Sequence, residues 1–391
     1  MKSMQPQNPK APNPEAVLPS GCVQACRACP HRGLTREQSL LDKENWVRRN
    51  FPEEAEKIHP ILGSSLRWKY RERAVLHVEK IAPSESASDT SVWRVGLFQD
   101  EVVLPIPKCP IHSDRLNRVI ENVRVLFPSE FFLRFIVVNG RILTLVLKQK
   151  RESISPVLRE GLNKILEASA SDLDGIYISW NPSAGNRVLS VKTLEHGAGK
   201  KTSVFSPSRD TFFQEVEHGP TQFLQTHFEI YSKALQKVFR FHTNPNILDL
   251  YMGLGLTTRV WASHGFSVLG VDLALEAVSF LQGKPGIQAL QGRVGDRIPQ
   301  IEKWIELNPV QAIHLNPSRL GVGKEVLEKL FSMKNFNPRT LSYLSCSVKS
   351  LREDAETLKK WGWVVHEIQP FDFFPQTKQV EVLLLARKFV G

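Results

Sequence analysis

The chain has 391 residues, enough for two or three domains with their own cores. It carries 51 Lys and Arg against 40 Asp and Glu, and this formal charge of +11 favours nucleic acid or an acidic surface as the partner. No apolar run is long enough for a membrane-spanning helix, and the first residues lack the apolar core of a signal peptide. We therefore expect a cytoplasmic protein whose five cysteines serve metal binding or catalysis rather than disulfides.

The amino-terminal region combines low complexity with clustered cysteines. Residues 1–19 are rich in Pro, Asn and Gln, and we expect a disordered tail there. Three cysteines follow in a C-x3-C-x2-C pattern, Cys22, Cys26 and Cys29, and a fourth, Cys109, lies in a Pro-flanked loop. Four thiolates suit zinc and an iron–sulfur cluster equally well by count, so these residues predict a metal site without naming the metal.

Residues 20–205 show the mixed pattern of a small α+β substrate domain. The predicted helices lie at 35–49 and 113–125, and the predicted strands at 73–78, 93–98, 135–138, 142–147, 175–180 and 187–194. The first helix places Leu40, Leu41 and Trp46 on one side, and Asn139-Gly140 predicts a hairpin turn. In the segment 67–73 aromatic residues alternate with Arg and Lys, a pattern found both on RNA-binding surfaces and on solvated strand faces.

The remaining chain, 206–391, predicts a second, larger domain. A basic, polar stretch at 197–209 indicates a linker before it. Helices are predicted at 221–239, 324–331 and 351–361, and strands at 312–315, 341–344, 363–368 and 380–386. Alternating helices and strands of this kind are typical of an open, mostly parallel sheet, here with a terminal hairpin. We therefore predict a doubly wound, Rossmann-like α/β domain.

The clearest ligand-binding signal lies near the start of this domain. An apolar run at 247–251 breaks at Gly253 and Gly255, a helical stretch follows, and a second apolar run ends on Asp272. Glycines in such a turn let the backbone approach a ligand, and an acid about 20 residues further on can accept hydrogen bonds from ribose hydroxyls. Thr258 stands where a dinucleotide-binding turn has its third glycine, which favours S-adenosylmethionine over a dinucleotide.

Two further strand ends carry residues of types that take part in catalysis, and ligands of such sheets bind beyond the ends of the strands. Cys346 follows the apolar strand at 341–344, where it is either a small buried side chain or a nucleophile. Glu381 opens the last apolar strand and is either an edge carboxylate facing water or a base in the same pocket as Cys346.

Together these features resemble the S-adenosylmethionine-dependent RNA 5-methyluridine methyltransferases. That family's D-P-P-R-x-G motif corresponds to residues 316–321, its S-C-N-P motif to 345–347, and its F-P-x-T-x-H-x-E motif to 374–381. Its S-F-F-Q segment is similar to 210–214, and its L-Y-C-G-x-G turn to 250–255. The order and spacing of the motifs agree over the whole of the carboxy-terminal half.

The resemblance implies a role for each matched residue. It implies that S-adenosylmethionine is contacted by Phe212, Gln214, Tyr251, Gly253, Gly255, Asp272 and Asn316. Cys346 would attack C6 of uracil, and Glu381 would remove the proton from C5. Cluster-containing members space four cysteines as this chain spaces Cys22, Cys26, Cys29 and Cys109, which favours a 4Fe–4S cluster over zinc. The C-x3-C-x2-C spacing is also that of radical S-adenosylmethionine enzymes, but Ala28 stands where those enzymes have an aromatic residue.

Four positions depart from the family pattern: Asn316 replaces Asp, Ser318 replaces Pro, Ser347 replaces Asn and Gln379 replaces His. Because the nucleophile and the base are retained, we expect an active enzyme that forms 5-methyluridine in RNA. A catalytically lapsed RNA-binding homologue is the alternative. No RNA-binding barrel precedes the cysteines, which resembles both the shorter ribosomal-RNA-modifying members and the tRNA-modifying members, but the latter lack the cysteine cluster. We therefore expect 23S ribosomal RNA as the substrate, with tRNA as the alternative, and a monomeric protein.

Overall fold

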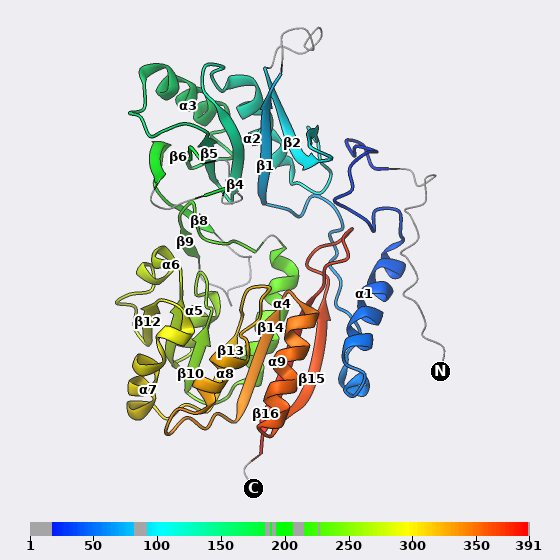
Figure 1. Ribbon diagram of the computed structural model, residues 1–391, viewed down its shortest axis with the longest axis vertical. Helices are drawn as coiled ribbons and strands as arrows, with labels where there is room; N and C mark the ends of the chain where they lie inside the picture. Colours follow the sequence, from blue (N-terminus) through cyan, green and yellow to red (C-terminus); the bar gives the residue numbers. More distant parts are fainter. Residues whose placement is uncertain are drawn as a thin grey trace.

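The structure, a computed structural model, describes residues 18–81, 92–183, 188–189, 193–205, 215–225 and 227–389. Within these residues the strands form two seven-stranded sheets and one two-stranded sheet (Figure 1). The strands are β1 (Arg73–Lys80), β2 (Trp93–Gln99), β3 (Val102–Pro105), β4 (Leu133–Asn139), β5 (Ile142–Leu147), β6 (Gly175–Trp180), β7 (Leu194–Gly199), β8 (Ser203–Phe205), β9 (Val216–His218), β10 (Asn246–Leu250), β11 (Ser267–Asp272), β12 (Ile287–Gln291), β13 (Ala312–Leu315), β14 (Thr340–Ser345), β15 (Trp363–Phe371) and β16 (Glu381–Lys388). The helices are α1 (Arg36–Asn50), α2 (Asp114–Leu126), α3 (Pro156–Ala168), α4 (Phe228–Phe241), α5 (Leu256–Ser263), α6 (Leu275–Ser279), α7 (Ile298–Leu307), α8 (Lys324–Phe331) and α9 (Val348–Lys360). None of the helices in these residues is long and apolar enough to cross a membrane.

The first sheet has the strand order β3-β2-β1-β4-β5-β6-β7. Its neighbouring strands are antiparallel except for β5 and β6, which are parallel and are connected through α3. Helices α2 and α3 cover one face, where Leu116 and Leu162 are fully buried with the sheet's apolar side chains. The β4–β5 hairpin forms as predicted, but its turn residues are Gly140 and Arg141, one position later than expected.

The second sheet has the order β12-β11-β10-β13-β14-β16-β15. Strands β10 to β14 run parallel, whereas β16 is antiparallel to both β14 and β15. This confirms the predicted Rossmann-like sheet with its terminal hairpin. The carboxyl ends of β10, β11, β13 and β14 therefore meet at one edge, which is where such sheets bind ligands.

Several predicted element limits are wrong between the two sheets. The helix expected at 221–239 begins only at Phe228, as α4. The stretch expected as a linker contains the end of β7 and all of β8. These strands contain Gly, His, Ser and Glu rather than alternating apolar residues, so backbone pairing in the folded protein, not side-chain pattern, defines them.

Helix α1 packs on the second sheet, far from its neighbours in the sequence. A capping box starts the helix: the Thr35 side chain accepts from the Gln38 backbone, and the Gln38 side chain accepts from the Thr35 backbone. Val47 lies in the core of the second sheet, and α1 contacts α9. In Figure 1, α1 runs alongside this sheet. The following segment extends the sheet through parallel bridges of Ile58 to Ile368 and Leu62 to Phe371.

The buried side of α1 is not the predicted one. Leu41 and Trp46 are 57% and 46% exposed, whereas Lys43 and Val47 are buried. Lys43 forms an ion pair with Asp372, which explains how a charged residue can occupy this face. How the chain divides into domains stays a prediction, but residues 36–62 pack with the carboxy-terminal sheet.

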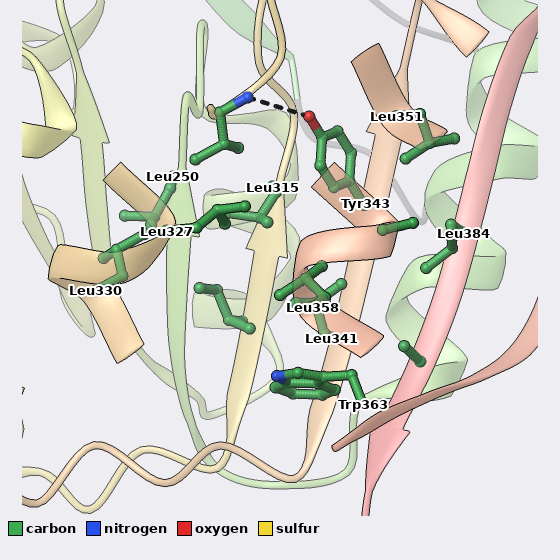
Figure 2. Close-up of a cluster of buried hydrophobic side chains, with 14 of the residues drawn as sticks. Leu250, Leu315, Leu327, Leu330, Leu341, Tyr343, Leu351, Leu358, Trp363 and Leu384 are labelled. Carbon is green, nitrogen blue, oxygen red and sulfur yellow. Dashed lines mark hydrogen bonds between the residues drawn. The ribbon is translucent and has the colours of Figure 1, made fainter. Parts of the chain in front are cut away.

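The core between the second sheet and helices α8 and α9 is built from large apolar side chains, as Figure 2 shows. One hydrogen-bonded group lies inside it. The hydroxyl of Tyr343 accepts from the Val322 backbone N–H (3.2 Å) and donates to Asp354 Oδ2 (2.7 Å). Asp354 Oδ1 also accepts from the Gly323 N–H (3.1 Å). These bonds fix the loop after β13, which carries Asn316 and Arg319, against α9.

Candidate active site

The turn after β10 has a left-handed backbone at three positions, two of which are glycines. Tyr251, Gly253 and Gly255 have φ angles of +62°, +55° and +67°. A side chain at Gly255 would come within 2.5 Å of Leu281, whereas one at Gly253 would meet no atom within 4 Å. The space above Gly253 is therefore open, and a ligand can approach the backbone there.

The carboxylate of Asp272 lies beside this turn, as predicted. Its Oδ2 atom accepts from the Gly253 N–H (2.9 Å), and its Oδ1 atom accepts from the Ala274 N–H (2.8 Å). An ionised carboxylate has about four acceptor sites, so two remain for ribose hydroxyls. Asn316 is joined to the same edge, because its backbone N–H donates to the Leu250 carbonyl (3.1 Å).

Asp249 is a site residue that the sequence interpretation missed. It is fully buried on β10, and its Oδ2 atom accepts from the hydroxyls of Thr257 (2.7 Å) and Thr258 (2.6 Å). Burial raises the pKa of Asp249 to about 6. Thr258 thus has a structural role at the position of the third glycine. An acid inside an otherwise apolar strand was the available signal.

Cys346 and Glu381 are brought together by strand register. Antiparallel pairing of β14 with β16 places Ser345 opposite Val382, so the next residues outward are Cys346 and Glu381. Cys346 is partly buried and Glu381 is 5% exposed. The charge of Glu381 raises the pKa of Cys346, as expected for neighbouring groups. The interpretation of Glu381 as a water-facing edge carboxylate is therefore wrong.

Arg319 is a charged residue that acts on both groups, and no role was assigned to it from the sequence. Burial and the Glu381 charge raise the pKa of Cys346, while Arg319 opposes that rise by its charge and a side-chain hydrogen bond. Burial likewise raises the pKa of Glu381 to about 8, again opposed by Arg319. Ser350 holds the Arg319 backbone through a hydrogen bond from Ser350 Oγ to its carbonyl (2.9 Å). Arg319 thus favours the ionised forms of both the thiol and the carboxyl.

The four amino-terminal cysteines also come together. Cys22, Cys26, Cys29 and Cys109 line one cavity of about 80 Å³. Burial and the thiols of Cys109 and Cys26 raise the pKa of Cys29 to about 12. Among the described residues, no three His, Cys, Asp or Glu side chains are close enough as placed to hold a metal ion. The four thiols are the donor type that binds an iron–sulfur cluster or zinc, but as placed they share a cavity without converging on one point.

Two predicted cofactor residues, Phe212 and Gln214, lie outside the described residues. The segment 67–73 is less available to RNA than its sequence indicates. Tyr70 is buried, whereas Lys69 stays exposed although it forms an ion pair with Asp114 (2.9 Å).

Known proteins resemble the chain over most of its length. No protein-family profile matches it. An uncharacterized RNA methyltransferase of Protochlamydia amoebophila is 27% identical over 352 residues, covering 83% of this chain and 72% of that protein. Another, of Caldanaerobacter subterraneus, is 25% identical over 397 residues, covering 93% and 83%.

One solved structure is similar throughout. It is the Pyrococcus abyssi tRNA (uracil-54, C5)-methyltransferase in complex with S-adenosyl-L-homocysteine. Its TM-score is 0.70 at 19% identity, and the match covers 92% of this chain and 84% of that one. The chain thus shares the fold of this methyltransferase over most of the length of both.

Proposed function

We propose that the protein is an S-adenosylmethionine-dependent RNA methyltransferase that forms 5-methyluridine. The observation that carries this proposal is the meeting of Cys346, Glu381 and Arg319 beside the glycine turn and Asp272. The similarity to RNA methyltransferases supports the reaction class. The likeness to an enzyme that acts on C5 of a tRNA uracil supports the position of methylation.

The chemistry needs a nucleophile and a base, because C5 of uracil is unreactive until a group adds at C6. Cys346 as thiolate forms a bond to C6 and generates an enolate. The C5 atom of this enolate then takes the methyl group from the sulfonium, whose S–CH3 bond breaks to leave S-adenosylhomocysteine. Glu381 removes the C5 proton, the C5–C6 double bond re-forms, and the Cys346 thiolate leaves.

Arg319 supports both ionised groups in this sequence of steps. The thiol of Cys346 and the carboxyl of Glu381 both have raised pKa values, so each is largely protonated near neutral pH in the free protein. A fixed positive charge next to them lowers the cost of forming the thiolate and then the carboxylate. The target base has to leave its stack to reach them.

The cofactor would bind at the carboxyl ends of β10, β11 and β13. Asp272 offers free acceptor sites to the ribose, and Gly253 leaves space at the turn. Tyr251, Gly255 and Asn316 complete this edge. By the family resemblance, Phe212 and Gln214 also contact S-adenosylmethionine.

For the RNA we propose 23S ribosomal RNA, because the four-cysteine site resembles that of the members that modify ribosomal RNA. A tRNA substrate is the second candidate, and the solved tRNA methyltransferase of similar fold favours it. Either substrate places the enzyme in the cytoplasm. The nucleophile and the base belong to one chain, so a monomer suffices for the reaction.

The proposed reaction is tested by trapping. The protein and S-adenosylmethionine are incubated with total RNA containing 5-fluorouridine, and denaturing electrophoresis detects any covalent adduct. Fluorine at C5 cannot leave as a proton, so the Cys346–C6 bond persists. We expect an adduct with wild-type protein and none with Cys346→Ala, and sequencing of the trapped RNA identifies the substrate.

Two outcomes of this test contradict the proposal. An adduct that survives Cys346→Ala would exclude Cys346 as the nucleophile. If wild-type protein still binds cofactor and RNA but forms no adduct, the result would support a homologue that has lost catalysis. The replacements at Asn316 and Ser347 would then account for the lost activity.

We also propose that Cys22, Cys26, Cys29 and Cys109 hold a 4Fe–4S cluster, with zinc as the alternative. Their common cavity and the all-thiol donor set support this. Protein purified without oxygen should contain about four iron and four sulfide per chain. Stoichiometric zinc without iron would contradict the cluster, and Cys346→Ala is the control because it leaves the four ligands intact.

A further inference from the structure

The loop that leads to Glu381 is held by a distant part of the chain. This base loop, residues 372–380, connects β15 to β16. Among the described residues, each of its hydrogen bonds to another part of the chain goes to residues 31–70. The Tyr70 hydroxyl donates to the Pro375 carbonyl (2.9 Å), and Lys43 Nζ donates to the Phe374 carbonyl (3.1 Å).

Further bonds hold Gln376, next in the loop. Its carbonyl accepts from the His31 N–H (3.0 Å), and its side-chain oxygen accepts from Arg67 (3.3 Å). Gln376 has a φ of +71°, a left-handed conformation that residues with a side chain rarely adopt. The surrounding contacts therefore impose the shape of the base loop.

The side chains that anchor the base loop are buried, so their hydrogen bonds determine the position of the loop. Tyr70 is 5% exposed and Lys43 is 1% exposed, and Asp372, the partner of Lys43, is also buried. A buried polar group that loses its partner costs about 1–3 kcal/mol, so the loop has few alternative positions. The four-cysteine cavity is also lined by Tyr70, which anchors the base loop, and by Thr377, which belongs to it. The cavity therefore lies directly beside the base loop.

We propose that Tyr70 is a positioning residue for the Glu381 base, acting through the base loop with the support of Lys43. The inference rests on the proposed uridine methylation. Proton removal requires the carboxylate within hydrogen-bond reach of the C5 proton, and a displacement of about 1 Å can cost roughly 100-fold in rate. The nucleophile belongs to a different loop, so its chemistry does not depend on Tyr70.

This separation predicts a distinct intermediate. When the base loop is loosened, the Cys346–C6 bond still forms and C5 still takes the methyl group from the sulfonium. The C5 proton then stays in place, so the C5–C6 double bond cannot re-form and the Cys346–C6 bond does not break. A covalent, methylated protein–RNA adduct accumulates on ordinary uridine.

The test compares Tyr70→Phe with wild type on ordinary RNA and on 5-fluorouridine RNA, both with S-adenosylmethionine. We expect about fivefold more adduct on ordinary RNA, the effect of losing one hydrogen bond, and equal trapping on 5-fluorouridine RNA. The matched control is Tyr177→Phe, which removes a hydroxyl bonded to the Lys201 carbonyl (2.6 Å) in the first sheet. The control should behave as wild type.

A second variant strengthens the test. Lys43→Met with Asp372→Leu replaces the buried ion pair by apolar side chains, a change that proteins often tolerate, and removes the bond to Phe374. It should accumulate at least as much adduct as Tyr70→Phe. Release of ordinary RNA at the wild-type rate by both variants would overturn the positioning role, as would equal accumulation in Tyr177→Phe.

Hydrogen exchange gives a reading that is independent of activity. In protein without RNA, amides of the base loop should exchange faster in Tyr70→Phe than in wild type or Tyr177→Phe. Unchanged exchange would overturn the anchoring itself. Failure of the proposed reaction has a different signature, because wild-type protein would then form no adduct even with 5-fluorouridine RNA.

Discussion

Arg319 is the residue that favours ionisation of both Cys346 and Glu381. Without it, a buried thiol next to a buried carboxyl would resist ionisation of either group. Its position follows from the loop after β13, which α9 holds through Ser350 and Asp354. The family motif contains an arginine at this position, but only the structure shows which groups it faces.

Replacing Arg319 should therefore raise the pKa of Cys346. In Arg319→Met the thiolate loses its nearby positive charge, and an opposite charge typically lowers a pKa by about 1–3 units. We expect the midpoint of Cys346 alkylation, followed by peptide mass spectrometry from pH 7 to about 12, to move upward by about one pH unit or more. Methyl transfer at neutral pH should fall about tenfold or more and recover as the pH rises.

The control for this prediction is Arg352→Met, on the exposed side of α9, where Arg352 faces Glu356 (3.6 Å). An unchanged Cys346 midpoint in Arg319→Met would show that the guanidinium does not act on the thiol.

At the scale of elements, α1 illustrates how a helix can be recognised and its packing face still be misjudged. Its capping box and length were predictable from local sequence. Its buried face consists of Ser39, Lys43 and Val47, and two of these three are polar. Residues that contact this face, such as Asp372, lie more than three hundred residues away in the sequence. Only the folded chain brings them together.

Val47→Ala should therefore destabilise the carboxy-terminal sheet although it lies on an amino-terminal helix. Val47 is fully buried in the core of that sheet, so the loss should be about 1–3 kcal/mol in the free energy of unfolding by urea. Leu41→Ala, on the same helix but at a 57% exposed position, should cost less than about 0.5 kcal/mol. Equal effects of the two substitutions would contradict the packing of α1.

At the scale of the whole molecule, four parallel strands of the second sheet were predicted from the sequence, whereas helices α3 and α7 and strand β12 were not. Strands β10, β11, β13 and β14 are short apolar runs between helical patterns, and their parallel sheet follows from that alternation. Strands β7 to β9 were missed or misplaced, because their residues show no apolar alternation.

Some residues of the candidate site were likewise predictable from the sequence, and others were not. Cys346, Asp272 and Gly253 stand at strand ends that the sequence marks, and the structure places them at one edge. The pairing of Cys346 with Glu381 required the register of β14 and β16, which a single sequence does not determine. Asp249 and the anchors of the base loop were missed because their partners are set by tertiary contacts.

The place of β16 has a consequence for how the protein is made. Residues 381–388 insert between β14 and β15, which precede them in the chain. During translation, β14 and β15 are therefore synthesised before the strand that pairs with both of them. Until residue 388 is available, β14 has an open edge, Glu381 cannot face Cys346, and α1 has only part of its docking surface. The proposed catalytic pair, Cys346 and Glu381, is thus completed last, so an interrupted chain carries the proposed nucleophile without the proposed base.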